Sequence, residues 1–259
     1  MNYFQSDQNQ PENQVPPTPP IPRYLTGPKR SKPILTYVLV GLTVLFYLGQ
    51  VAVEQIFGFD LLFFFLGKVN EAILLGQVWR LFTPALLHAS PLHLLANMYA
   101  LYMLGRSYET INGHLRFVLL YLISAFGGNV LSFVLGKYNS LGASTATFGL
   151  LTAEAVFIWQ NRDFFANRGR SNLINIAMIL AVNLMIGLSA GTMIDNWGHL
   201  GGAIAGLVFA FLAGTRWQID RVNGIPAFMD QRTKKDAWLA FGLVFFAFAI
   251  IAAIPFFSR

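Results

Sequence analysis

The sequence of 259 residues contains no cysteine, which excludes a disulfide, a thiolate nucleophile and a cysteine-ligated metal site. It is also poor in charge, because Lys, Arg, Asp and Glu make up only 12% of the chain, whereas soluble domains carry roughly 25%. Apolar residues account for 55% and are gathered in long runs. Several runs approach the roughly 20 residues that a membrane-spanning helix needs. The composition therefore predicts an all-α, multi-pass membrane protein.

The net charge of +6 is a feature that nucleic-acid-binding proteins also show. Membrane proteins, however, collect Lys and Arg on their cytoplasmic loops. This explanation needs no partner other than the lipid bilayer, so we expect no nucleic-acid partner.

The chain divides into a polar tail, a long apolar region and a final apolar helix. Residues 1–32 are rich in Pro, Gln and Asn and are predicted to form a disordered cytoplasmic tail. We expect the main unit over 33–215, with an interfacial segment at 58–91 that is too broken for a span. A cytoplasmic linker and a last span are predicted within 216–259. The predicted spans are about 34–57, 92–106, 115–135, 144–159, 173–188, 197–213 and 238–257.

The distribution of Lys and Arg orients these spans. If the N-terminus is inside, fourteen of these side chains fall on the inner side and four on the outer side, which is a clear positive-inside bias. The outer four are Lys68, Arg80, Lys137 and Arg259. We therefore expect a cytoplasmic N-terminus, and a bacterial plasma membrane is the simplest location.

Polar side chains inside apolar spans are costly and rare, so each marks a candidate site. His93 and Asn97 open the second span and, at positions i and i+4, share one helix face. Ser144 opens the fourth span and His199 opens the sixth. The first inner arginine follows 18 residues after Ser144 and 17 after His199. These separations predict similar heights of roughly 27 and 26 Å, near the outer face.

These residue types suit nucleophilic acyl transfer. A serine hydroxyl needs an adjacent base, usually histidine, and the reaction needs donors aimed at the developing oxyanion. We expect His93 and Asn97 to supply such donors, together with the backbone N–H of Ser144 at the positive end of its helix. A serine in a helix more often packs against its own backbone. The similar height of His199 favours the catalytic interpretation.

Three further features surround this set. Gly198, Gly202 and Gly206 repeat at i+4 and predict close contact between the sixth and fourth spans, although this spacing is common in membrane helices. Asp195 is interpreted as a helix N-terminal carboxylate rather than a third catalytic residue. Glu154, in the middle of the fourth span, is expected to accept a buried hydrogen bond or to pair with an inner arginine.

The motifs, in this order and topology, resemble those of rhomboid proteases over about residues 33–215. They are Trp79-Arg80, the HxxxN pair His93 and Asn97, Gly142-Ala-Ser144, His199-Leu-Gly-Gly202, and Gly105-RSY-Glu109 at the inner end of the second span. The interfacial pair Trp79 and Arg80 is expected to anchor its segment.

The resemblance implies a six-helix rhomboid bundle plus a seventh C-terminal transmembrane helix, as in bacterial members. It implies a catalytic dyad of Ser144 and His199, an oxyanion site that includes His93 and Asn97, and no cofactor or metal. The substrates would be transmembrane proteins, cut in or near their membrane segment and entering past the fifth span, beside the small residues at 187–191. The family usually has Gly after the serine. This chain has Thr145, which we interpret as a tolerated variation that crowds the oxyanion loop or the substrate.

Two other classes of function remain open. A catalytically inactive relative that binds transmembrane helices would typically lack the serine or the histidine, and both are present here. A transporter would place polar groups in both leaflets and usually has repeated halves, whereas these polar groups cluster near one face. We therefore predict a serine endopeptidase and keep the inactive helix-binding protein as the alternative.

Overall fold

The computed structural model describes residues 28, 30–189, 194–222 and 225–257. Most of the predicted tail at 1–32 lies outside these residues, as do residues 190 and 191 of the loop expected beside the substrate path. These two predictions are therefore left untested.

Helices make up most of the described chain. The long ones are α1 (Ile34–Phe57), α5 (Arg106–Leu135), α6 (Ser144–Gln160), α7 (Ala166–Leu188), α8 (Asn196–Ala213) and α9 (Lys234–Phe257). Helix α4 (Pro91–Ala100) continues into α5 through a π-helical turn, Leu101–Gly105. Between α1 and α4 lie α2 (Leu61–Leu66), α3 (Asn70–Leu74) and two 3₁₀ turns, Val78–Leu81 and Thr83–Leu86. Another 3₁₀ turn, Arg162–Phe164, joins α6 to α7, and a hairpin of β1 (Trp217–Val222) and β2 (Ile225–Asp230) joins α8 to α9.

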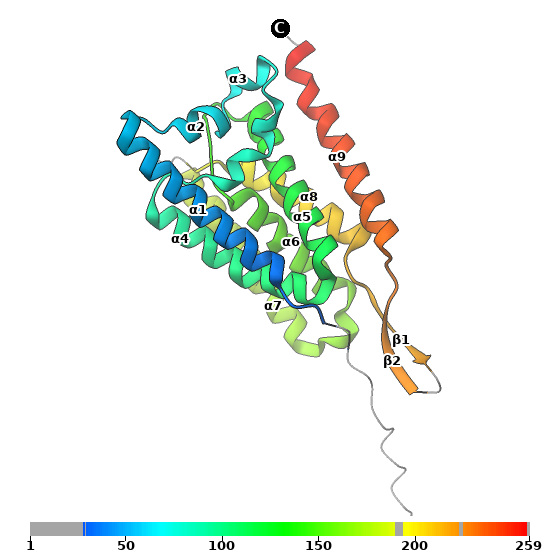
Figure 1. Cartoon of the computed structure of the whole chain (residues 1–259). Helices are drawn as coiled ribbons and strands as arrows, with labels where there is room; N and C mark the ends of the chain where they lie inside the picture. Colours follow the sequence, from blue (N-terminus) through cyan, green and yellow to red (C-terminus); the bar gives the residue numbers. More distant parts are fainter. Residues whose placement is uncertain (1–27, 29, 190–193, 223–224, 258–259) are drawn as a thin grey trace, which may run out of the picture.

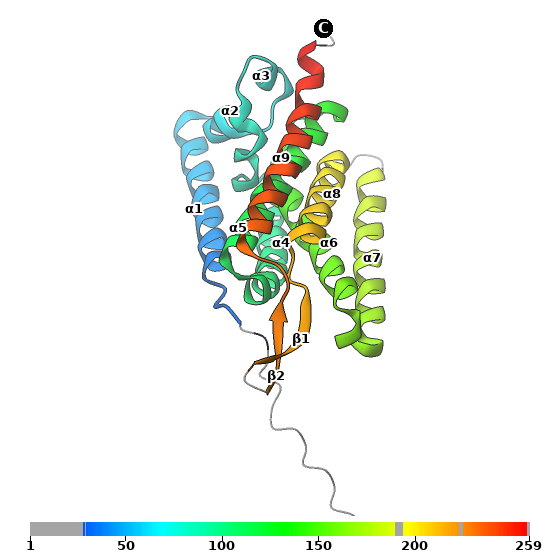
Figure 2. The ribbon, with the colours of Figure 1, turned by 90° about the vertical axis from the view of Figure 1, so that its right-hand side faces the viewer.

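The long helices form a bundle with different structures at its two ends. Helices α2 and α3 lie at one end and the hairpin extends from the other (Figure 1). In the perpendicular view, α1 and α7 lie at opposite edges, with α6 and α8 between them (Figure 2). The segment 58–91, predicted to be interfacial, is divided into short helices and 3₁₀ turns.

The continuous helical stretch from α4 to α5 reverses direction at Gly113. This glycine has φ 80° and ψ 169°, a backbone conformation that favours glycine. A methyl group added at Gly105 would lie 3.1 Å from a ring carbon of Phe117, although twelve residues of continuous helix would separate them by roughly 18 Å. The predicted second and third spans are therefore the two arms of this stretch.

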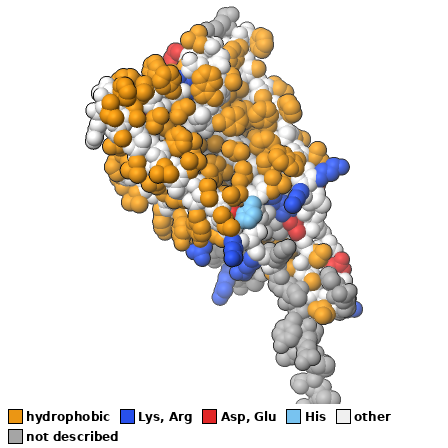
Figure 3. Space-filling model, viewed as in Figure 1, with side chains coloured by type: hydrophobic (Ala, Val, Ile, Leu, Met, Phe, Trp, Pro, Cys, Tyr) orange, Lys and Arg blue, Asp and Glu red, His pale blue; other side chains and the backbone are white. Residues whose placement is uncertain are grey.

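The surface of the bundle suits a bilayer. Within the described residues, five helical stretches are long and apolar enough to cross a membrane: Ile34–Phe57, Pro91–Leu135, Arg168–Leu188, Asn196–Ala213 and Lys234–Phe257. Hydrophobic side chains cover most of the face shown in Figure 3, and Lys and Arg gather at the end that carries the hairpin. Large side chains such as Leu45 and Ile250 are 66% and 71% exposed, which suits contact with lipid better than with water. The chain is a multi-pass integral membrane protein.

Glycines let α8 pack closely against two neighbours at once. A methyl group added at Gly206 would lie 2.7 Å from the carbonyl carbon of Gly149 in α6. On the other side, one added at Gly201 would lie 2.7 Å from Cβ of Leu131 in α5. Both distances are too short for a real Cβ. The predicted contact between the sixth and fourth spans is thus present, with a second contact that the sequence did not predict.

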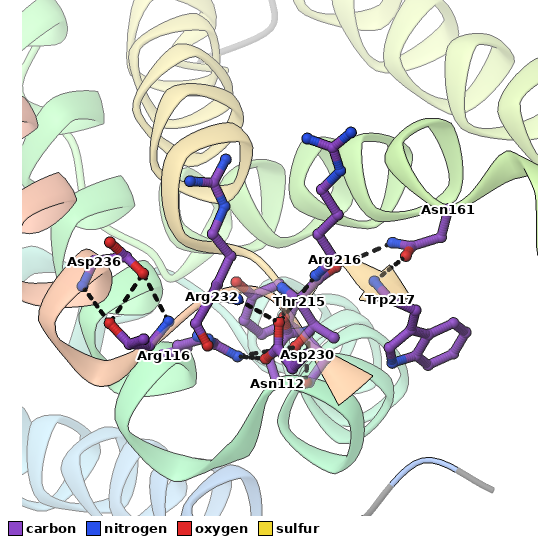
Figure 4. Close-up of polar contacts among 11 residues, drawn as sticks. Asn112, Arg116, Asn161, Thr215, Arg216, Trp217, Asp230, Arg232 and Asp236 are labelled. Carbon is purple, nitrogen blue, oxygen red and sulfur yellow. Dashed lines mark hydrogen bonds and ion pairs between the residues drawn. The ribbon is translucent and has the colours of Figure 1, made fainter. Parts of the chain in front are cut away.

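The hairpin is fixed to the bundle by a partly buried polar cluster (Figure 4). Arg116 of α5 donates to Asp230 at 2.5 Å, to Thr215 at 2.9 Å and to the carbonyl of Arg232 at 2.7 Å. The two strands are antiparallel, with Trp217 opposite Asp230. The segment after the sixth span, predicted only as a linker, therefore contains an ordered element held by α5.

Candidate active site

The first turn of α4 fixes the orientation of His93 and Asn97. Ser90 caps the helix, and its hydroxyl accepts a hydrogen bond from the backbone N–H of His93 at 3.2 Å. The backbone N–H of Ala89 is directed at Nδ1 of His93 at 3.5 Å. This leaves Nε2 as the protonated nitrogen of the neutral ring. Asn97 is buried one turn later, so both side chains face inward.

The interfacial segment holds the loop that precedes Ser144. Lys68 and Ser140 exchange two backbone hydrogen bonds of 3.0 and 3.1 Å, and Nζ of Lys68 donates to the carbonyl of Tyr138 at 2.7 Å. The backbone N–H of Gly142 donates to the carbonyl of Pro84 at 2.9 Å. Burial lowers the pKa of the Lys68 amine to about 8, and the carboxylates of Asp195 and Glu71 oppose this shift only partly.

Trp79 and Arg80 anchor the same segment, as expected. Arg80 is 3% exposed and donates to the carbonyls of Gly67 at 2.7 Å and Phe64 at 2.6 Å. The indole N–H of Trp79 donates to the carbonyl of Phe65 at 3.1 Å. Since these carbonyls belong to α2 and the turn after it, the pair fixes the fold of the segment that holds the Ser144 loop.

Gly142 is the point at which α4 meets this loop. Its φ of 128° lies in the region that favours glycine. A methyl group added there would lie 2.8 Å from Nε2 of His93 and 3.8 Å from Nδ2 of Asn97. The ring N–H and the side-chain amide therefore converge on the backbone two residues before Ser144.

Ser144 and His199 lie at the same end of the contact between α6 and α8. The ring of Phe148, one turn after Ser144, stacks on the ring of His199 with centroids 4.1 Å apart and an interplanar angle of 11°. A methyl group added at Gly202, one turn after His199, would lie 2.8 Å from the carbonyl carbon of Thr145. Ser144 and His199 are both half-buried. As the first residue of α6, Ser144 has a backbone N–H with no acceptor within the helix.

Asp195 caps α8, as the sequence indicates. Its carboxylate accepts a hydrogen bond from the backbone N–H of Gly198 at 2.8 Å and another from the hydroxyl of Ser132, while its carbonyl accepts from the N–H of His199. Nδ1 of His199 is buried and has no hydrogen-bond partner among the described residues. The histidine ring is therefore held by the Phe148 stack and not by a carboxylate.

Comparison with known proteins supports the family that the motifs indicate. A sequence model of the Rhomboid domain matches residues 75–216, which include the four candidate residues. The chain belongs to the rhomboid family.

Several named rhomboid proteins are similar to it. "Rhomboid protease GluP" of Bacillus subtilis (strain 168) is 36% identical over 192 residues, which is 72% of this chain and 36% of that protein. "RHOMBOID-like protein 1" of Arabidopsis thaliana is 41% identical over 57% of this chain and 37% of its own length. "Rhomboid-like protease 1" of Toxoplasma gondii is 38% identical over 53% of this chain and 47% of its own length. The chain thus spans less than half of these rhomboid relatives.

Thr145, the departure from the usual rhomboid glycine, is buried against α5. It is 5% exposed, and a methyl group added at Gly128 of α5 would lie 2.6 Å from its Cβ. The absence of a side chain at Gly128 makes room for the β-branched residue. Thr145 therefore packs against α5 at the position of Gly128.

Three residues important to the geometry were not predicted from the sequence to belong to the site, although Glu109 is part of the Gly105-RSY-Glu109 motif. Phe148 orients His199, and its only signal was an aromatic residue one turn after the serine. Glu109 is fully buried and accepts hydrogen bonds from the backbone N–H groups of Leu35 at 2.9 Å and Thr36 at 2.7 Å, at the start of α1. His88 is buried beside His93, and burial lowers its pKa to about 3, so it stays neutral.

Two further features are the contacts of Glu154 and the distribution of side chains that bind metals. Glu154 accepts a hydrogen bond of 3.5 Å from Ser107 and forms no ion pair with a described arginine. In the part of the chain that the structure describes, no group of three or more His, Cys, Asp or Glu is placed to hold a metal ion.

Proposed function

We propose that this chain is an intramembrane serine endopeptidase in which Ser144 is the nucleophile and His199 the general base. The observation that supports this most strongly is the stack of Phe148 on His199, one turn from Ser144. It brings the two groups to one end of the α6–α8 contact. The convergence of His93 and Asn97 on Gly142 adds hydrogen-bond donors beside the same loop.

In the proposed reaction, Oγ of Ser144 attacks the peptide carbonyl carbon while His199 takes the hydroxyl proton. The resulting oxyanion accepts hydrogen bonds from the backbone N–H of Ser144, the ring N–H of His93 and the amide of Asn97. His199 then gives its proton to the leaving amine, and the peptide C–N bond breaks. Water attacks the acyl-enzyme in the second half, with His199 again as base, and releases Ser144.

The stack on Phe148 supports a dyad that works without a carboxylate. In a catalytic triad, the third residue holds the imidazole in one orientation. Here the ring of Phe148 lies nearly parallel to the His199 ring, with centroids 4.1 Å apart, and restricts its rotation. The carboxylate of Asp195 is already bonded to Gly198 and Ser132.

The proposed substrates are membrane-anchored proteins, cut in or near their transmembrane segment. The candidate site lies at the ends of helices buried in an apolar bundle, on the side away from the Lys- and Arg-rich end. Together with the positive-inside rule, this supports a cytoplasmic N-terminus and hairpin and a site towards the outer leaflet. The same arrangement supports the six-plus-one topology, and the proposed location is a bacterial plasma membrane.

The test is cleavage of a membrane-anchored substrate by the purified chain in liposomes. Ser144→Ala and His199→Ala should abolish cleavage, and Ser171→Ala, at an exposed position in α7, should leave it unchanged. Retained cleavage by Ser144→Ala would overturn the assignment. Substrate binding by the wild type without any cleavage would instead support the inactive helix-binding alternative.

A further inference from the structure

A pocket lies near the end of the bundle opposite the candidate active site. Its volume is about 180 Å³, and Ile111, Phe157, Phe165 and Trp217 form its apolar wall. Glu154 and Arg30 are its charged lining residues, and Pro28 completes the rim. Glu154 follows Ser144 by ten residues in α6, which separates the two sites by roughly 15 Å along the helix axis.

The aromatic wall is a packed unit built from three elements. Phe157 of α6 lies edge-to-face with Trp217 of β1 at 5.0 Å and with Phe165 at 5.7 Å. The backbone N–H of Trp217 donates to the side chain of Asn161 at 2.7 Å. The wall therefore keeps its shape through its own contacts.

The two charged side chains have few partners. Among the described residues, Glu154 accepts one hydrogen bond, of 3.5 Å, from Ser107. Burial of a carboxylate in an apolar wall is costly in free energy unless hydrogen-bond donors surround it. Arg30 is exposed and forms no ion pair with any described carboxylate. Opposite charges thus line one pocket without being paired to each other.

We propose that this pocket binds the headgroup of an aminophospholipid of the inner leaflet, namely a primary ammonium two carbons from a phosphate. The ammonium offers the Glu154 carboxylate three N–H donors. The phosphate is bound by the guanidinium of Arg30, which suits phosphate oxygens. The aromatic wall contacts the methylenes between the two charges.

The depth and size of the pocket agree with this ligand. Glu154 lies eight residues before Arg162, the first basic residue after α6, or roughly 12 Å along the helix. The carboxylate therefore lies inside the hydrocarbon region. Arg30, before α1, and Trp217, at the start of β1, lie nearer the inner boundary between hydrocarbon and headgroups, where aromatic residues are enriched. The 180 Å³ volume equals that of about six water molecules, which is suitable for a small headgroup.

The chemistry discriminates against other common headgroups. A trimethylammonium group carries no N–H donor for Glu154. A phosphoglycerol headgroup brings a negative charge with no cation to face the carboxylate, which is unfavourable in a low-dielectric pocket. The site is therefore selective for the primary amine. This inference concerns the inner end of the bundle and uses no step of the proposed proteolysis.

The test measures lipid binding to the purified full chain in detergent, by native mass spectrometry and by the midpoint of thermal unfolding. Short-chain phosphatidylethanolamine should bind and raise the midpoint more than phosphatidylcholine or phosphatidylglycerol at the same concentration. Glu154→Gln should weaken binding of phosphatidylethanolamine by about tenfold, because it removes the charge that the ammonium contacts. Arg30→Glu, at an exposed position, should do the same without disturbing the fold.

Two matched controls carry the same changes elsewhere. Glu54→Gln on the exposed face of α1 and Arg221→Glu in β1 should bind as the wild type does. Equal binding of the three lipids, an undiminished preference for phosphatidylethanolamine in Glu154→Gln, or undiminished affinity for phosphatidylethanolamine in Arg30→Glu would overturn the proposal. Soluble phosphoethanolamine distinguishes the source of the headgroup. Equally tight binding of that compound would contradict a lipid ligand.

Discussion

Replacing Gly202 by alanine tests whether the close approach of α8 to α6 positions the site. The added methyl group would overlap the carbonyl oxygen of Thr145 and lie 2.8 Å from its carbonyl carbon. Because backbone atoms of both helices meet here, no side-chain rotation relieves the contact. The helices must separate by about 1 Å to reach an ordinary carbon–carbon distance of roughly 3.5–4.0 Å.

This separation should affect catalysis more than folding. Overpacking costs about 1–3 kcal/mol of stability, and the better helix propensity of alanine offsets up to about 1 kcal/mol. A displacement of about 1 Å between catalytic groups, however, lowers the rate by roughly 100-fold. We therefore expect Gly202→Ala to fold and to cleave a membrane-anchored substrate about 100 times more slowly than the wild type.

The assay compares kcat in liposomes with the midpoint of thermal unfolding for each variant. Gly242→Ala in α9 is the matched control, because its methyl group would meet no atom within 4 Å. It should keep wild-type kcat. Wild-type kcat in Gly202→Ala would refute the argument that this contact sets the distance between Ser144 and His199.

Three further predictions concern stability. Glu109→Gln should lower the free energy of unfolding by about 2–3 kcal/mol, since it weakens hydrogen bonds from a buried carboxylate to the start of α1; an unchanged thermal midpoint would contradict this. Asp230→Asn should lower the free energy of unfolding by about 2 kcal/mol, which is less than the loss of a fully buried pair because the Asp230 side chain is 29% exposed. Limited proteolysis should then cut this variant near the hairpin, and equal resistance to protease would show that Arg116 does not hold the hairpin. Burial lowers the pKa of Lys68 from 10.5 to about 8, so between these two pH values the unfolded chain binds more protons than the folded chain. The free energy of unfolding should therefore rise with pH, by up to about 3 kcal/mol. Lys68→Met should lack this rise, and parallel curves of stability against pH for the two proteins would refute the assignment.

The apolar runs predicted the helices best where their ends coincide with a change of composition. The first predicted span, 34–57, coincides with α1, and Ser144 begins α6 as predicted. Helix α7 begins at Ala166, before the predicted 173, because its first turns are polar. Hydropathy does not detect polar turns that extend a span.

Other features depend on contacts between distant segments. The stack of Phe148 on His199 and the fit of Thr145 against Gly128 join different helices, so helical periodicity alone does not predict them. The hairpin did have a local signal, since Asn223-Gly224 between two β-prone runs is typical of a tight turn. The segment is short and lies between two spans, so its length favours a linker.

Covalent labelling tests the proposed nucleophile most directly. The purified chain is treated with a serine-directed phosphonate at neutral pH, and the modified peptide is identified by mass spectrometry. The account predicts one adduct, on Ser144, which forms far more slowly in His199→Ala although that variant folds. An adduct on a different serine, or equal labelling of Ser144 with and without His199, would contradict it.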